Sequence, residues 1–106
     1  MADNSSYHAD IAKYVSSVDP AIVDSIVKYC GIALRSRDAS LVSCTDPEEL
    51  GRVRDGFASK KLGLSGDAAD KAMAAVCDKM KGDRTKSRVT FYYLLAEETG
   101  TTDALA

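Results

Sequence analysis

The residues from about 85 to 98 form the most apolar helical segment of this 106-residue chain. On a helical wheel of about 100° per residue, its apolar side chains cover an arc of roughly 200°. These side chains are Val89, Phe91, Tyr92, Tyr93, Leu95 and Ala96. A helix with so wide an apolar arc must pack against at least two neighbours. The segment is therefore predicted to lie at the centre of the fold.

Leu94 is the unusual residue of this segment. On the wheel it lies near Thr90, Glu97 and Glu98 and away from the apolar arc, while Phe91 stands at one edge of the arc. A single exposed leucine is common on protein surfaces and needs no explanation. The alternative is that Leu94, flanked by Phe91, forms the contact with a partner protein or a second copy.

Helix starts and stops predict four further helices. Asp19-Pro20 and Asp46-Pro47 each place an aspartate N-cap before a proline at the first helical position. Glu49 completes an acidic variant of the capping box. Gly31 and Gly63 suit the left-handed position that ends a helix. Together with the apolar spacing, these signals predict helices at about 6–17, 20–30, 47–62 and 67–81.

The remaining segments contain no run with the alternating period of a strand. Residues 35–45 have neither period, and both a loop and a short helix remain open for the segment 31–45. A chain of this length has no room for a second core. We therefore predict an all-α fold, a single-domain bundle of about five helices. Its ordered core covers about 6–98, and residues 1–5 and 99–106 are expected to be frayed.

Several motifs occur in combination along the chain: 38–43 (DASLVS), 46–50 (DPEEL), 60–64 (KKLGL) and 88–96 (RVTFYYLLA), with Phe57 between them. In this combination they resemble an uncharacterised bacterial family of small helical proteins, domain-of-unknown-function family 2853. The resemblance spans roughly residues 11–97. It implies a compact helical domain in the bacterial cytoplasm, and it implies no activity and no catalytic residues.

The chain has three cysteines, Cys30, Cys44 and Cys77. They are odd in number, widely spaced and in no C-x-x-C pair, which predicts reduced thiols rather than a disulfide framework. Cys30 and Cys77 fall on apolar helix faces, where a thiol is usually a small core hydrophobe. Cys44 precedes a helix N-terminus and is the candidate reactive thiol, with an ordinary loop cysteine as the alternative.

No catalytic, cofactor-binding or metal-ligating constellation is visible. A metal site needs three or four converging ligands, and the single histidine, His8, stands near one end of the chain. The adjacent carboxylates Glu48-Glu49 and Glu97-Glu98 diverge by about 100° on a helix and cannot share a proton. The sequence therefore predicts a protein that is not an enzyme and binds no metal or cofactor.

Residues 79–88 form a basic segment within a chain whose net charge is −2. That net charge gives no bulk attraction to nucleic acid or to a membrane. Cations close to two tyrosines nevertheless favour nucleic-acid binding. The alternative is a solvated helix junction in which Arg88 pairs with a carboxylate or extends to solvent. The candidate anion contacts are Lys79, Lys81, Arg84 and Lys86.

Two functions are therefore expected. The first is a small non-catalytic cytoplasmic protein that binds another protein or itself. The second is an accessory nucleic-acid-binding protein that uses residues 79–88. Neither a secretory signal pattern in residues 1–6 nor a run of about 18 apolar residues is visible, which predicts a cytoplasmic location without a membrane span. The second function also uses Arg35, Arg37, Arg52 and Arg54.

Overall fold

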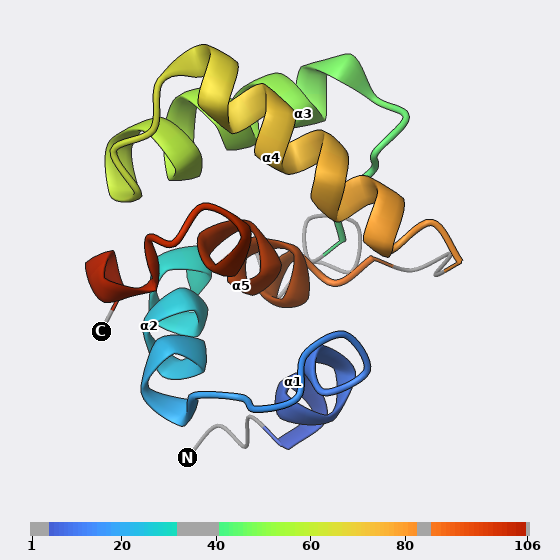
Figure 1. The fold of residues 1–106 in the computed structure, drawn as a ribbon, viewed down its shortest axis with the longest axis vertical. Coiled ribbons are helices and arrows are strands. Elements are labelled where there is room, and N and C mark those ends of the chain that lie inside the picture. Colours follow the sequence, from blue (N-terminus) through green and yellow to red (C-terminus); the bar gives the residue numbers. More distant parts are fainter. Residues whose placement is uncertain (1–4, 32–40, 83–85, 106) are drawn as a thin grey trace.

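The computed structural model describes residues 5–31, 41–82 and 86–105, and these residues are helical apart from their connections (Figure 1). The elements in chain order are α1 (Ser5–Ile11), α2 (Pro20–Cys30), α3 (Pro47–Val53), the π-helical segment η2 (Arg54–Lys61), α4 (Gly66–Lys79), α5 (Arg88–Glu98) and the short 3₁₀ helix η3 (Thr102–Ala104). The described residues contain no strand, only an isolated antiparallel bridge between Leu41 and Ser87. The all-α prediction is thereby confirmed. Residues 41–45 contain no helix, and residues 32–40 lie outside the described part.

The predicted aspartate caps and the left-handed glycines are confirmed. The Asp19 carboxylate accepts a hydrogen bond from the Ala21 amide at 3.0 Å, and α2 begins at the following proline. Asp46 caps α3 in the same way. Gly31 and Gly63 have φ angles of 49° and 71°, in the left-handed region that favours glycine.

The predicted helix at 47–62 is divided into two kinds of helix. α3 ends at Val53, and η2 continues the chain with the wider turns of a π-helix. At its end the Leu62 amide donates to the carbonyl of Phe57 at 3.1 Å, five residues earlier. Two consecutive residues of η2, Phe57 and Ala58, are both buried. Segments of π-helix are uncommon and are found frequently at functional sites.

The two ends of the described chain also differ from the prediction. α1 is shorter than the expected 6–17, because a turn follows Ile11. The segment expected to be frayed after residue 98 instead forms η3. Gly100, with φ of 68°, reverses the chain there, and the Thr101 amide donates to the Ala96 carbonyl at 2.8 Å. This reversal buries Leu105, which is 3% exposed.

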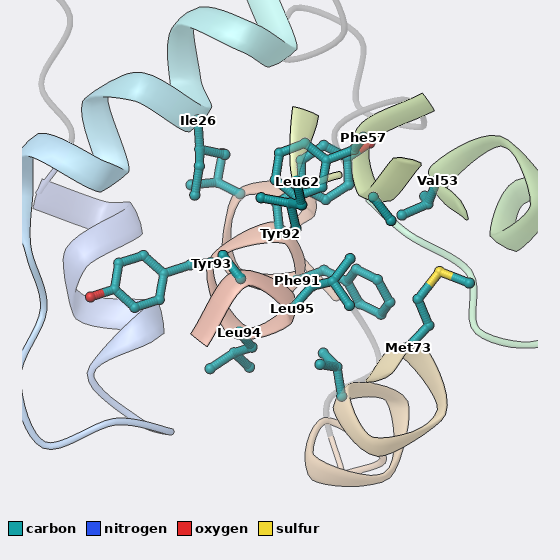
Figure 2. Packing of buried hydrophobic residues seen from close by; sticks show 14 of the residues in the cluster. Ile26, Val53, Phe57, Leu62, Met73, Phe91, Tyr92, Tyr93, Leu94 and Leu95 are labelled. Carbon is teal, nitrogen blue, oxygen red and sulfur yellow. The ribbon is translucent and has the colours of Figure 1, made fainter. Parts of the chain in front are cut away.

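α5 is the central helix, as predicted. It packs against α1, α2, α4 and η3. Every residue from Val89 to Ala96 is buried. Figure 2 shows the side chains of Phe91, Tyr92, Tyr93 and Leu94 leaving α5 in different directions. The helix therefore has no solvent-facing side over these two turns.

The expectation that Leu94 is exposed, either as an isolated surface leucine or as a partner contact flanked by Phe91, is wrong. Leu94 is 1% exposed and Phe91 is fully buried. On the helical wheel, the polar residues near Leu94 indicate a face that is exposed to solvent. Thr90, one turn before Leu94 on the same face, is instead fully buried, and its hydroxyl donates to the carboxylate of Asp10 on α1. Because α1 supplies this acceptor, the polar face can be covered by protein.

We expect Leu94→Ala to lower the free energy of unfolding by about 2–5 kcal/mol, because it leaves a cavity beside the central helix. The exposed Glu97→Ala on the same helix is the matched control and should change stability by less than about 0.5 kcal/mol. Urea unfolding followed by circular dichroism measures both values. Equal unfolding midpoints for the two variants would show that Leu94 is not part of the core.

Candidate interaction surface

Three aromatic rings meet where the end of α2 approaches η2 and α5. Phe57 and Tyr92 are buried and stacked, with ring centroids 3.9 Å apart and an interplanar angle of 11°. The ring of Tyr29 lies 5.4 Å from Phe57 and 6.4 Å from Tyr92. Tyr29 is 44% exposed and is the one large hydrophobic side chain among the described residues that is exposed to this extent. We call these three residues the aromatic cluster.

Arg88 lies against the inner side of the aromatic cluster. Its guanidinium carbon is 5.6 Å from the centroid of the Tyr92 ring, and its Nη1 donates to the Tyr92 hydroxyl at 2.9 Å. Its Nη2 donates to the Leu41 carbonyl at 3.4 Å and forms an ion pair with Glu49. The side chains of Arg88 and Glu49 are 12% and 14% exposed. The expectation that Arg88 pairs with a carboxylate is confirmed.

Glu49 therefore has a different role from the predicted capping box. Its carboxylate reaches across to Arg88 on α5 and also contacts Arg52, 3.4 Å away, on its own helix. Local spacing favours a bond back to the start of α3. A half-buried arginine is the stronger partner, because an unpaired buried charge costs several kcal/mol.

The surroundings of Arg88 and Tyr92 shift the pKa values of both side chains. Burial raises the pKa of Tyr92, and the positive charge of Arg88 acts in the opposite direction. Burial acts to lower the pKa of Arg88, but Tyr92 and Glu49 raise it more, so that it lies above its ordinary value. Arg88 therefore remains a cation and Tyr92 a neutral donor or acceptor at neutral pH.

Cys30, the last residue of α2, is a free thiol that packs against the core, as the sequence predicted. Burial raises the pKa of this thiol from 9.0 to about 11, and the charge of Arg88 offsets only part of the effect. The nucleophilic form of cysteine is the thiolate. Cys30 is therefore a poor nucleophile at neutral pH.

We expect Cys30 to react slowly with iodoacetamide in the native protein. The rise in pKa from 9.0 to about 11 lowers the thiolate fraction at neutral pH roughly a hundredfold. The rate should increase about tenfold per pH unit until the pH reaches the pKa of about 11. Mass spectrometry of the labelled protein measures the rate, with the urea-unfolded chain as control. A native rate equal to the unfolded rate would contradict the burial of this thiol.

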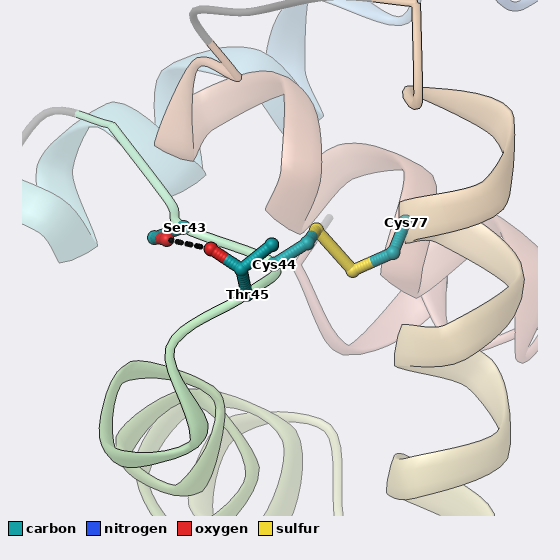
Figure 3. Close-up of a disulfide and its surroundings, with 4 residues drawn as sticks. All are labelled: Ser43, Cys44, Thr45 and Cys77. Carbon is teal, nitrogen blue, oxygen red and sulfur yellow. Dashed lines mark hydrogen bonds between the residues drawn. A yellow bond between two sulfur atoms is a disulfide. The ribbon is translucent and has the colours of Figure 1, made fainter.

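Cys44 and Cys77 form a disulfide with a Cα–Cα distance of 5.9 Å (Figure 3). This distance is normal for a disulfide. The prediction of three reduced thiols is therefore wrong, and so are the candidate reactive thiol at Cys44 and the core thiol at Cys77. The two cysteines are 33 residues apart, and the fold brings the segment before α3 beside the end of α4. Spacing along the chain contains no sign of this approach.

Replacing both disulfide cysteines, with Cys44→Ser and Cys77→Ser, should lower the free energy of unfolding by about 3–4 kcal/mol, because the link restricts the unfolded chain. Urea unfolding without reductant compares the variant with the wild type. Excess dithiothreitol is the control, and under it the two proteins should unfold at similar urea concentrations. If the variant were as stable as the oxidised wild type, the link would not stabilise the fold.

The basic residues at the end of α4 are paired with acids. Lys79 contacts Glu98 at 3.0 Å, and Lys81 contacts Asp78 at 3.8 Å. Lys86 is partly buried, and its carbonyl accepts a hydrogen bond from the Val42 amide. Arg84 lies outside the described residues. The structure therefore does not gather the predicted anion contacts into one described site, and their role stays a prediction.

The other basic residues of the nucleic-acid hypothesis also face acids. Arg52 contacts Glu48 at 3.6 Å, and Arg54 contacts Asp55 at 3.0 Å and Asp70 at 3.5 Å. Hydrogen bonds and charge from Asp55 raise the pKa of Arg54, and Arg54 lowers the pKa of Asp55. Arg35 and Arg37 lie outside the described part of the chain.

Comparison with known proteins gives a family for this fold. The family described as "Protein of unknown function (DUF2853)" matches residues 6–103, which is nearly the whole chain. The chain belongs to the DUF2853 family. The resemblance carried by the sequence motifs is thereby confirmed, and the description of the family names no activity. A search of curated proteins finds no match to the DUF2853 chain.

The described residues of the DUF2853 protein contain no group of three or more histidine, cysteine or carboxylate side chains that could hold a metal ion. Within the same residues, no helix has both the length and the apolar character needed to cross a membrane.

Proposed function

We propose that the DUF2853 protein acts by binding another protein through the surface around Tyr29. The observation that supports this proposal is an exposed tyrosine supported by two buried, stacked rings and by Arg88. Tyrosine is enriched at the energetic centres of protein interfaces. The neighbouring rings restrict the Tyr29 side chain before binding, which reduces the conformational entropy lost on association.

The charges around this surface indicate the chemistry of the partner. The last turn of α2 carries Lys28, and the last turn of η2 carries Lys60 and Lys61. All three are exposed, on the two elements that meet at the aromatic cluster. A partner that presents an apolar side chain with acidic residues around it would complement both features. A second copy of the chain is the other occupant predicted from the sequence.

The test uses Tyr29→Ala, with the exposed Lys71→Ala on α4 as matched control. We expect tagged wild-type protein to enrich a partner from extracts of its native host, and Tyr29→Ala to recover at least about tenfold less of it, as for an interface hot spot. Lys71→Ala should recover the wild-type amount. Thermal unfolding of both variants checks that each is folded. Equal recovery by the two variants, or no enrichment by the wild type, would overturn the proposal.

Two further measurements separate the remaining alternatives. Sedimentation of the purified protein detects self-association, and a dimer that is lost in Tyr29→Ala would identify a second copy as the occupant. Electrophoretic mobility at low salt tests the nucleic-acid alternative, and we expect no retardation of DNA or RNA by micromolar protein. Retardation that weakens when Lys79, Lys81 and Lys86 are neutralised would instead support binding through 79–88.

The cytoplasmic location and the bacterial setting are part of the same proposal. Both rest on the sequence and on the family resemblance. Fractionation of the native host, followed by detection with an antibody, tests the location. Recovery of the protein outside the cytoplasmic fraction would contradict it.

A further inference from the structure

Residues 41–46 form a strap that crosses from the start of α5 to the start of α3. At one end Leu41 pairs with Ser87, and the Val42 amide donates to the Lys86 carbonyl at 2.8 Å. At the other end Asp46 caps α3. The disulfide joins the middle of this strap, at Cys44, to the last part of α4 (Figure 3).

Both cysteines are positioned by contacts that do not involve sulfur. Cys44 is two residues after Val42, which is buried and whose amide donates to the Lys86 carbonyl before α5. Cys77 follows Val76, which is fully buried on α4, and α4 packs against α5. The two thiols would therefore stay close together in the reduced protein. Such an arrangement raises the effective concentration of one thiol near the other.

Both cysteines of the disulfide are partly exposed, and the buried core does not include them. Cys44 and Cys77 pack at the edge of the buried cluster. The adjacent Ser43 and Thr45 are exposed. The Glu49–Arg88 ion pair and the Leu41–Ser87 bridge hold the strap independently of the sulfur atoms. The bond thus joins two partly exposed residues, and the fold has other contacts to keep it intact.

We propose that Cys44 and Cys77 are a reversible redox pair that fixes the strap when oxidised and frees its middle when reduced. The helical fold is kept in both states. The oxidant is a low-molecular-weight disulfide of the glutathione class, and the reductant is a dithiol. A dithiol opens the bond at a lower concentration than glutathione does, because a single thiol competes poorly with a second protein thiol held beside the bond.

The exchange balances in two steps. One protein thiolate attacks a sulfur of glutathione disulfide, which forms a mixed disulfide and releases one glutathione. The second protein thiolate attacks the protein sulfur of that mixed disulfide, which closes the Cys44–Cys77 bond and releases the second glutathione. The protein loses two electrons, glutathione disulfide gains them, and the two thiol protons end on the released glutathiones. For opening, one thiolate of the dithiol attacks a sulfur of the Cys44–Cys77 bond and releases one protein thiolate. Its second thiolate then attacks the dithiol sulfur of that mixed disulfide, which releases the second protein thiolate and leaves the dithiol as a disulfide.

The experiment equilibrates the full chain with mixtures of glutathione and glutathione disulfide, starting from both the oxidised and the reduced protein. The protein is unfolded and its free thiols are labelled with N-ethylmaleimide. Mass spectrometry of the intact protein then gives the fraction in which the Cys44–Cys77 bond is closed. We expect one two-electron transition, identical from both directions. The constant for closing should be several hundred-fold larger in the native protein than in urea, because the fold holds the thiols together.

Three further readouts decide the proposal. Dithiothreitol should open the bond without denaturant, the helical circular dichroism should persist, and hydrogen exchange of residues 43–46 should become faster while that of α5 stays protected. Cys30→Ser should give the same transition, and Cys44→Ser should retain a mixed disulfide at Cys77. The proposal is overturned if the bond opens only in denaturant, if reduction removes the helical signal, or if closing is equally favourable in urea.

Discussion

The burial of α5 on all its sides determines how the other helices are placed. A helix surrounded by protein must satisfy its polar side chains from its neighbours, because water cannot reach them. Thr90 donates to Asp10 of α1, Tyr93 accepts from the Asp19 amide before α2, and Tyr92 accepts from Arg88, which is held by Glu49 of α3. Each polar group of the central helix thus fixes a different neighbour. The apolar burial supplies the stability, and these bonds supply the specificity of the arrangement.

The parts of this fold that depend on local chemistry could be predicted from the sequence. An aspartate before a proline, or a glycine after an apolar turn, acts within a few residues, so the start of α2 and its end at Gly31 follow from the printed sequence. The burial of Leu94 could not be predicted in this way. A helical wheel gives the direction of a side chain, and only the position of α1 decides whether solvent or protein lies in that direction.

The candidate site was missed for a related reason. Tyr29 belongs to the apolar side of α2. Its ring packs at the edge of the buried rings of Phe57 and Tyr92 and is therefore only partly covered. Its signal in the sequence is a large aromatic residue at the last turn of a helix, next to Lys28, where a fully buried ring would not be expected. The disulfide had no such signal. An odd number of cysteines is compatible with one bond and one free thiol, and the pairing of Cys44 with Cys77 depends on the tertiary fold.

One residue, Arg88, is hydrogen-bonded both to the strap and to the aromatic cluster. Its guanidinium binds the Leu41 carbonyl at the beginning of the strap and the hydroxyl of Tyr92, whose ring lies beneath Tyr29. Glu49, three residues after the cap at Asp46, completes the connection from the other end of the strap. The end of the strap and the support of the exposed tyrosine are therefore connected through the contacts of one side chain. Energetic coupling between two sites can be carried by chains of hydrogen-bonded and charged groups, and the Arg88–Glu49 ion pair is the group that contacts both the strap side and the aromatic side of this region.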